Sequence, residues 1–360
     1  MKLVIDARYV RITHHDGISR FTAGLIAAVS EYADVTMLIH DERQLEHLPR
    51  LPYLKINAPT SVLEPLAALQ VNKLRPDVVF SPMQTMGSWG RKFPLILTLH
   101  DLIYYAHPKA PGFLPAPIRA GWYLFHQVYW PQRMLLNRAD AVATVSHTTR
   151  DLMRRHRLTR RKIGIVSNAP NPVDAVRDPQ TQPAKTLLYM GSFMAYKNVE
   201  TLIDGMASLP DYELHLLSPI RPDRQTELEE RARPGTRLVF HNGVSDTEYA
   251  ELLARCTALV TLSREEGYGL PLVEAMSTGT PVVVSDMPIF REVAQDAALY
   301  VNSDSAEGFA SAVRELTDGD RWRELSRRSV ANAQRYSWQH SARQLMELCE
   351  YAITHSRVHR

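Results

Sequence analysis

Short apolar runs alternate with longer amphipathic stretches along the whole chain. The runs predict strands at 3–6, 35–39, 78–80, 95–100 and 141–146 in the first half, and at 186–191, 213–218, 237–242, 258–263 and 281–286 in the second. The stretches between them, such as 246–256 and 307–317, have the spacing of amphipathic helices. Runs that are apolar throughout and alternate with helices are typical of parallel strands covered on both faces. The pattern therefore predicts an α/β chain with two Rossmann-like, doubly wound parallel-sheet domains.

A break between the two series lies at 168–184, which contains four prolines and no periodicity. We expect an N-terminal domain over 1–170, a linker over 171–184 and a C-terminal domain over 185–337. A final amphipathic helix over 338–356 is expected to join the N-terminal domain. Ligands of such sheets bind beyond the carboxyl ends of the strands, so the two domains are expected to face each other across a cleft that holds those ends.

Composition restricts the class of protein. The chain has 360 residues, of which 45% are hydrophobic and 22% charged, which is ordinary for globular domains and excludes disordered and collagen-like chains. Its two cysteines, Cys256 and Cys349, are far apart and predict neither a disulfide framework nor a zinc site. The N-terminal sequence carries Asp6 and Arg8 and resembles no targeting peptide, and no run approaches the roughly 18 apolar residues of a membrane span. We expect a cytoplasmic protein, with a peripheral position at the inner face of the membrane left open.

Charge is distributed unevenly. Residues 1–170 contain 22 Lys and Arg against 12 Asp and Glu, whereas the remainder is acidic. A basic N-terminal half favours an anionic molecule or surface as its partner. The densest basic run, 154–162, is either a solvated helix face and turn or a patch for anionic lipid headgroups or a diphosphate-lipid acceptor. It lacks interleaved aromatic residues, so nucleic acid is not expected. The aromatic residues of 113–136 form either core or an interfacial anchor or acceptor platform.

The segment 263–286 combines features that suit an anionic ligand. A strand is expected to end at Ser263, Gly267 and Gly269 occupy a turn, and Pro271 stands at the expected first position of a helix. The glycines permit close approach of the backbone, and the helix directs N–H groups and a partial positive charge at the ligand, a geometry that suits a phosphate or a diphosphate. The carboxylates of Glu266 and Glu274 suit the vicinal hydroxyls of a sugar or ribose.

The order E, GYGLP, E, then GTPVV resembles the retaining glycosyltransferases of family 4, the group 1 glycosyltransferases, whose hallmark is an E-x7-E segment and whose fold is GT-B. The resemblance implies that Glu266 contacts the sugar hydroxyls and Glu274 the ribose hydroxyls. It also implies that the backbone amides of Gly267, Tyr268, Gly269 and Leu270 line the sugar and the diphosphate. Glu266 is a candidate nucleophile, although front-face attack needs none, and both possibilities stay open.

Four further segments are similar to the same family. In the segment 191–203, the resemblance implies that Lys197 binds the donor diphosphate. Two positions depart from the family, because Tyr196 stands where relatives often have arginine and Ser192 where they sometimes do. Segment 15–26 places Gly17 near the β-phosphate, 97–108 places His100 at the transferred sugar, and 237–253 places Val244 at the nucleobase.

Two motifs could suggest a metal. The pair His100–Asp101 is adjacent along a strand, where successive side chains point to opposite faces. His100 is therefore expected to be a buried histidine or a sugar contact. Asp318–Gly319–Asp320 spells the D-x-D of metal-dependent glycosyltransferases, but it lies between two helical stretches and predicts a solvated turn. No metal and no cofactor are expected, since the nucleotide sugar is itself the donor substrate.

The resemblance implies hexosyl transfer to a glycan or lipid-linked acceptor in polysaccharide biosynthesis. The residues IDAR, GISR and LHDL are typical of mannosyltransferase-like members, which favours GDP-mannose over a UDP-sugar. Three other hypotheses stay open: a donor-binding but inactive partner subunit, a nucleotide-sugar epimerase and a nucleic-acid binder.

Overall fold

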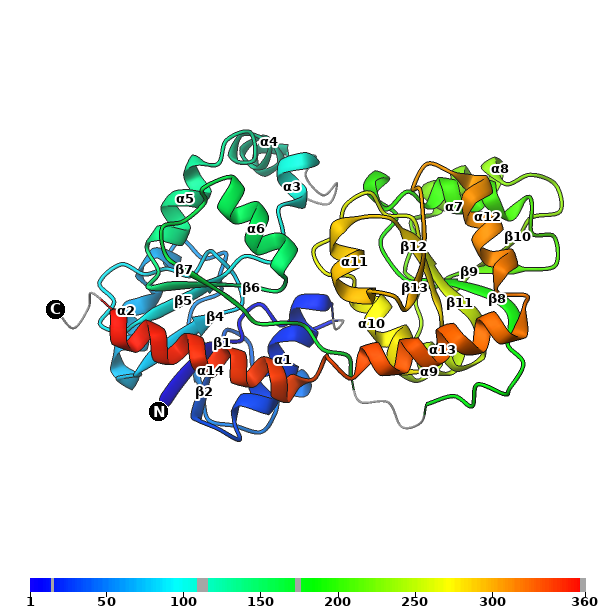
Figure 1. Cartoon of the computed structure of the whole chain (residues 1–360). Coiled ribbons are helices and arrows are strands. Elements are labelled where there is room, and N and C mark those ends of the chain that lie inside the picture. The colour runs from blue at the N-terminus through cyan, green and yellow to red at the C-terminus, as the bar shows by residue number, and fades with distance from the viewer. Residues whose placement is uncertain (14–15, 109–115, 172–175, 357–360) are drawn as a thin grey trace. The chain divides into compact units, whose positions relative to one another are not determined.

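The structure, a computed structural model, describes residues 1–13, 16–108, 116–171 and 176–356 (Figure 1). Parts of three predicted segments, namely His15, 113–115 and 172–175, lie outside the described residues. The chain forms two compact units: Met1–Ala169 with Tyr336–Arg360, and Pro170–Arg335. Each unit has its own sheet and its own hydrophobic core. The predicted pair of parallel-sheet α/β domains is confirmed.

The first unit is built on a parallel sheet with strand order β3-β2-β1-β4-β5-β6-β7. Its strands are β1 (Lys2–Asp6), β2 (Asp34–Ile39), β3 (Tyr53–Lys55), β4 (Val78–Ser81), β5 (Leu95–Thr98), β6 (Ala141–Thr144) and β7 (Lys162–Ile165). Its α-helices are α1 (Gly17–Val29), α2 (Ala67–Val71), α3 (Ile103–Ala106), α4 (Ala116–Phe125), α5 (Trp130–Asn137), α6 (His147–Arg155) and α14 (Trp338–His355), and its 3-10 helices are η1 (Glu42–His47), η2 (Glu64–Leu66) and η3 (Asn72–Leu74).

The second unit is built on a parallel sheet with strand order β10-β9-β8-β11-β12-β13. Its strands are β8 (Ala184–Tyr189), β9 (Glu213–Leu216), β10 (Arg237–Phe240), β11 (Cys256–Thr261), β12 (Val282–Ser285) and β13 (Ala298–Val301). Its helices are η4 (Ala195–Lys197), α7 (Val199–Met206), α8 (Pro222–Arg231), α9 (Asp246–Arg255), α10 (Leu270–Ser277), α11 (Pro288–Ala294), α12 (Ala306–Glu315) and α13 (Gly319–Ala333).

Burial follows the predicted pattern. The central strands β1, β4, β5, β6, β11 and β12 are buried along nearly their whole length, as parallel strands covered by helices must be. The last helix, α14, packs against α1 of the first unit, as Figure 1 also shows. Within the expected linker, Arg177 is fixed to the second unit, because its guanidinium donates to the carbonyl of Cys256 at 2.7 Å and stacks on Trp322.

Three strands of the structure are missing from the sequence prediction. β3 has only three residues, and most of its side chains are exposed, so no apolar run marks it. β7 directly follows the basic run and contains Gly164, whose added Cβ would lie 2.8 Å from Leu348 of α14. β13 begins with alanine and is short. All three strands lie at sheet edges, and for β3 and β7, whose side chains are exposed or partly exposed, the demand for apolar residues on both faces is relaxed.

Candidate active site

Both sheets have a topological switch point, where the strand order reverses on either side of the first strand of the unit. It lies between β1 and β4 in the first sheet, and between β8 and β11 in the second. Ligands of doubly wound sheets bind beyond the carboxyl ends of the strands at this point. The residues that follow these four strands are therefore the first candidates for a site.

In the second unit, the loop after β8 is held in place by Asn198. This residue is buried and left-handed, with φ of 55°, and its amide nitrogen donates to the carbonyls of Leu262 at 3.0 Å and Ser303 at 2.6 Å. The backbone N–H of Arg264 also donates to the carbonyl of Tyr196 at 2.8 Å. These bonds bring Lys197, the last residue of η4, to the end of β11.

Lys197 and Glu266 are in direct contact at the switch point. The ammonium Nζ of Lys197 lies 2.5 Å from Oε1 of Glu266, and their side chains are only 14% and 16% exposed. The hydroxyl of Ser263 donates to the same carboxylate oxygen at 3.0 Å. Two residues expected to bind the diphosphate and the sugar thus lie side by side, although 69 residues separate them in sequence.

The loop that leads into α10 has the geometry expected of a ligand-binding turn. Gly269 is the N-cap of α10 and has a φ of +92°, and an added Cβ would lie 2.9 Å from a ring carbon of Phe290. Only glycine fits there without strain. The sequence predicts Pro271 at the first position of this helix, but the helix begins at Leu270, so Pro271 occupies the second position. Tyr268 is buried, and Glu274 is half-buried in the second turn of α10.

Val244 lies in the loop between β10 and α9. The two residues before it are hydrogen-bonded to the loop between β9 and α8. The N–H of Gly243 donates to the carbonyl of Leu217 at 2.9 Å, and Oδ1 of Asn242 accepts from the N–H of Ile220 at 3.0 Å. Val244 itself is half-buried at the carboxyl end of β10, two strands away from β8. Its place in the fold is thus the same edge of the sheet as Lys197 and Glu266.

In the first unit, His100 follows β5 and contacts the segment after β4 and the helix α1. Its Nε2 lies 2.7 Å from the carbonyl oxygen of Pro82, and its ring meets Phe21 of α1 edge-on at 5.2 Å. Burial lowers the pKa of His100, which favours the neutral imidazole. A carbonyl oxygen only accepts, so Nε2 carries the proton and Nδ1 is the acceptor nitrogen.

Gly17 is the first residue of α1, the helix that carries Phe21. Asp16 caps this helix through a bond from the N–H of Ser19. A Cβ added at Gly17 would meet no atom within 4 Å, so packing inside the unit does not require glycine there. A ligand that approaches the backbone closely is one reason for a glycine at such a position.

A buried ionic cluster beneath the first switch point was not anticipated from the sequence. The guanidinium of Arg8 forms paired bonds with the carboxylates of Asp6 and Glu64, at 2.6–2.9 Å, and also donates to the carbonyl of Asn57. Burial opposes the charge of Arg8, but the two carboxylates outweigh it and raise its pKa further. The signal for this cluster was the polar pair Asp6 and Arg8 at the end of an apolar run.

Asn198 and Ser263 were also missed as site residues. Both are buried polar residues that orient the Lys197–Glu266 pair. Their signals in the sequence are weak: Asn198 stands next to Lys197, and Ser263 stands at the end of a predicted strand. The motif Asp318–Asp320 is a helix cap, since the carboxylate of Asp318 accepts from the N–H of Asp320 at the start of α13. Asp101 similarly accepts from the N–H of Ile103. Within the described residues, no group of three or more His, Cys, Asp or Glu side chains is arranged to hold a metal ion.

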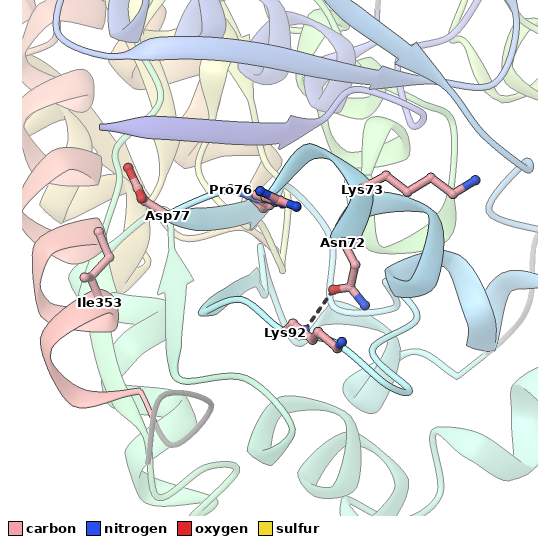
Figure 2. A pocket seen from close by; sticks show the side chains of 7 residues that line it. Asn72, Lys73, Pro76, Asp77, Lys92 and Ile353 are labelled. Atoms are coloured by element: carbon pink, nitrogen blue, oxygen red, sulfur yellow. Dashed lines mark hydrogen bonds between the residues drawn. The ribbon is translucent and has the colours of Figure 1, made fainter.

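A cavity of about 610 Å³ in the first unit lies elsewhere (Figure 2). Figure 2 shows its lining, which comprises Asn72, Lys73, Arg75, Pro76, Asp77, Lys92 and Ile353. There the side chain of Asn72 accepts from the backbone N–H of Lys92 at 2.8 Å. Most of its lining residues come just before β4, so the cavity lies at the edge of the sheet where the strands begin. His100 follows β5 and therefore lies at the opposite edge, where the strands end. This cavity is therefore not the candidate active site.

Two doubly wound parallel-sheet α/β units in one chain are the architecture of the GT-B glycosyltransferase fold. The chain superposes on sucrose-phosphate synthase from Thermosynechococcus elongatus with a TM-score of 0.75 at 20% identity, over 99% of this chain and 100% of the other. Family models match over residues 17–174, for Glycosyltransferase Family 4, and over 174–336, for Glycosyl transferases group 1. The chain belongs to this family of group 1 and family 4 glycosyltransferases, which are hexosyltransferase enzymes.

Relatives with assigned activities align with much of the chain. It is 26% identical over 318 residues to the O-antigen chain mannosyltransferase RfbU of Salmonella typhimurium, which covers 83% of this chain and 87% of the relative. It is 31% identical over 166 residues to O-antigen chain mannosyltransferase B of Escherichia coli, which covers 44% of this chain and 43% of the relative. In the part of the chain that the structure describes, no helix is both long enough and apolar enough to cross a membrane.

Proposed function

We propose that the chain transfers mannose from GDP-mannose to a glycan or glycolipid acceptor, with retention of the anomeric configuration and without a metal ion. The observation that carries this proposal is the 2.5 Å contact between Lys197 and Glu266 at the switch point of the second sheet. It joins a cation suited to a diphosphate to a carboxylate suited to sugar hydroxyls, beside the N-terminus of α10.

The donor would replace the ion pair by new contacts. Lys197 would turn from Glu266 to the diphosphate oxygens, and Glu266 would then accept from hydroxyls of the sugar. Together with the N-terminus of α10, Lys197 stabilises the negative charge that develops as the nucleoside diphosphate leaves, which is the work a metal does in other transferases. Glu274 is assigned to the ribose hydroxyls, Val244 to the nucleobase, and the amides of Gly267, Tyr268, Gly269 and Leu270 to the sugar and diphosphate.

Two residues of the first unit are assigned to the same donor. Gly17 is assigned to the β-phosphate, because no packing contact explains its glycine. His100 is assigned to the transferred sugar, because its neutral ring presents Nδ1 as an acceptor for a hydroxyl.

In the reaction, the bond between the anomeric carbon and the phosphate oxygen breaks and its electrons leave with the diphosphate. The acceptor oxygen then bonds to the same face of that carbon, and its proton passes to a phosphate oxygen of the departing diphosphate. Glu266 is the candidate nucleophile if the reaction proceeds through a covalent intermediate.

The choice of donor rests on relatives and on sequence segments. Two curated relatives are named mannosyltransferases of the O-antigen chain, and Ile5–Arg8, Gly17–Arg20 and Leu99–Leu102 are typical of mannosyltransferase-like members. A lipid-linked O-antigen-type glycan is the acceptor class that these names favour, and such an acceptor would bring the enzyme to the inner face of the membrane. A UDP-sugar-dependent transferase is the second candidate, and a donor-binding, inactive partner subunit is the third.

Turnover of labelled donors tests the proposal. The purified chain is incubated with radiolabelled GDP-mannose or UDP-glucose and a lipid extract that contains lipid-linked glycans, with and without EDTA. We expect a mannosylated, α-linked product from GDP-mannose at a rate that EDTA leaves unchanged. Label transferred only from the UDP-sugar would keep the enzyme class but overturn the donor. Nucleotide binding without any product would favour the inactive subunit.

A further inference from the structure

Two histidines of the second unit are hydrogen-bonded to each other close to Val244. His215 lies in β9, and His241 follows β10, three residues before Val244. Nε2 of His241 lies 3.1 Å from Nδ1 of His215, and the two ring centroids are 5.1 Å apart. The side chains of His215 and His241 are only 13% and 17% exposed. The proposed chemistry does not use this largely buried pair of titratable rings.

A carboxylate lies at each end of the pair. Nε2 of His215 lies 3.4 Å from Oε2 of Glu213, and Nδ1 of His241 lies 3.5 Å from Oε1 of Glu248. The four side chains form a row in the order Glu213, His215, His241 and Glu248, which we call the histidine row. Its members come from β9, from the end of β10 and from α9, which Figure 1 shows in the second unit.

The histidine row has three contacts, and each contact needs one proton. A carboxylate only accepts, so the nitrogen that faces Glu213 and the nitrogen that faces Glu248 must both carry a proton. The contact between the rings needs one more, because two bare nitrogens repel each other and so do two N–H groups. A neutral pair carries two protons and a doubly charged pair carries four. Only a pair with a single positive charge satisfies all three contacts.

The surroundings place this charge on His241. Burial lowers the pKa of His215 and outweighs the hydrogen bond with Glu213, which raises it. His215 is therefore the neutral ring, and its Nε2 carries the proton that it donates to Glu213. The His241 imidazolium then donates from Nε2 to His215 and from Nδ1 to Glu248.

Other charged groups surround the pair. Arg237 of β10 lies 3.6 Å from Oε1 of Glu213, which leaves the second oxygen of that carboxylate to His215. β8 places the uncharged Thr186 and Leu188 opposite Glu213 and His215. Further titratable side chains of α9 and of the segment after β9 are those of Arg221, Asp223, Asp246, Tyr249, Glu251 and Arg255. These groups act alike on wild type and on variants of the row, so a comparison of variants isolates the proton of the row.

The histidine row also closes the loop that carries Val244. The loop begins at His241 and ends at the start of α9, where Ser245 is the N-cap and its hydroxyl accepts from the N–H of Glu248 at 3.1 Å. The contact of His241 with the carboxylate of Glu248 joins the two ends of this loop. The position of Val244 therefore depends on a contact that exists only while Nδ1 of His241 carries a proton.

We infer that His241 is a positioning residue of the donor site, whose protonated form holds the turn of Val244 against the nucleobase. The inference rests on the proposed function, which assigns Val244 to the nucleobase. Loss of the proton leaves one carboxylate of the row facing a bare nitrogen, and the turn is released. Nucleotide binding and protonation are thus linked, so affinity falls as the pH rises through the titration of the pair. A second proton, taken up at lower pH, breaks the bond between the rings, so affinity passes through a maximum.

Titration calorimetry of the full chain with GDP-mannose and with UDP-glucose, from pH 5.5 to 8.5, tests the inference. Both diphosphates are substituted at each end and lack a phosphate group that titrates in this range. We expect wild type to bind its donor about fivefold more weakly at pH 8.5 than at the maximum, which is the effect of one hydrogen bond. His241→Phe should bind about fivefold more weakly than wild type at that maximum and show no dependence on the titration of the pair.

Glu248→Gln separates positioning by the proton from a merely structural role. The amide of the glutamine can donate to Nδ1 of His241, so a neutral pair with two protons satisfies all three contacts. This variant should therefore keep its affinity at pH 8.5, where wild type loses it. The control Glu251→Gln removes an exposed carboxylate of the same helix and should follow the wild-type profile. Both variants should unfold at the wild-type temperature.

Nitrogen-15 spectra of the histidine rings test the proton count without any nucleotide. As the pH is lowered from 8.5, His241 should be the first of the two rings to carry protons on both nitrogens, while His215 keeps a single proton on Nε2. His215→Phe and His241→Phe assign the signals. Two neutral rings throughout the range, donor binding that does not change with pH, or a Glu248→Gln profile that falls like wild type would each overturn the inference. Failure of both nucleotide sugars to bind at any pH would overturn the proposed function instead, and the ring spectra would then decide the proton count alone.

Discussion

Lys197 is the residue on which the proposed chemistry depends most. Its ammonium is the cation held against Glu266, and no other lysine contacts that carboxylate in the described residues. Lys197→Ala should lower the rate of sugar transfer by at least 100-fold, because a donor aimed at developing charge commonly contributes 10²–10³ in rate. Initial rates with labelled donor measure this effect.

A lysine elsewhere on the same sheet gives the control. Lys185 of β8 pairs with Asp211 at the surface, and Lys185→Ala should transfer sugar at the wild-type rate. Transfer by the Lys197 variant at more than about a tenth of the wild-type rate would sink the diphosphate assignment, provided that its unfolding temperature matches wild type.

His100 gives stability a pH dependence with a defined sign. Burial lowers its pKa in the folded unit below the ordinary value of about 6.5, so the unfolded chain binds the proton more readily. The neutral ring stabilises the fold fully above that value, and this contribution is lost as the pH falls below it. The free energy of unfolding should therefore be lower at pH 5.5 than at pH 7.5.

His100→Gln isolates this contribution, because glutamine can still donate to the carbonyl of Pro82 but does not titrate. Denaturant unfolding at the two pH values should show a smaller difference for the variant than for wild type. Other histidines with lowered pKa, such as His215, affect both proteins alike. An equal or larger difference in the variant would contradict the neutral assignment of His100.

At the scale of elements, alanine substitutions at the glycines that open α1 and α10 should have opposite effects on the stability of the fold. Gly269 has a positive φ and lies against Phe290, so Gly269→Ala should destabilise the protein by about 1–3 kcal/mol. Gly17 has neither constraint, and alanine favours helices, so Gly17→Ala should keep or slightly raise stability while transfer falls. Unfolding and transfer are measured on both variants. A fully active Gly17→Ala would remove Gly17 from the site.

The element β1 ends in the buried cluster of Asp6, Arg8 and Glu64, which ties the strand to η2. Arg8→Met should destabilise the first unit by about 3–5 kcal/mol, because two carboxylates would be left buried without their cation. Arg43→Met, which breaks an exposed pair with Asp41, should have no measurable effect on denaturant unfolding. Near-wild-type stability of Arg8→Met would show that the cluster is dispensable.

The elements also show what could be predicted from sequence. The long apolar runs located the central strands, because burial on both faces leaves a continuous apolar signal. Edge strands such as β3 and β7 carry a weaker signal, and Gly164 of β7 is explained only by the packing of Leu348 of α14, which lies 184 residues further along the chain. The segment 266–274 could be interpreted locally, whereas the contact of Glu266 with Lys197 depends on strand order and on the buried amide of Asn198.

At the scale of the whole molecule, charge and fold are divided between the two units. The acidic second unit carries the pair of Lys197 and Glu266, and the basic first unit carries His100 and Gly17. The sequence predicted this division of charge from composition alone. It did not distinguish the solvated and functional interpretations of 154–162, because that distinction depends on which side chains share a surface with Trp130 and Met134.

Thermal unfolding with nucleotides tests the central claim, that the chain binds a nucleotide-sugar donor through Lys197, most directly. GDP, UDP, ADP and their common sugar conjugates are compared on wild type, Lys197→Ala and Lys185→Ala. We predict that GDP and GDP-mannose raise the unfolding temperature of wild type and Lys185→Ala but not of Lys197→Ala. Ligand at about 100 times its dissociation constant stabilises by roughly 2.7 kcal/mol, a shift that is readily seen. No shift of the wild-type protein with any nucleotide, or an equal shift in Lys197→Ala, would contradict the account.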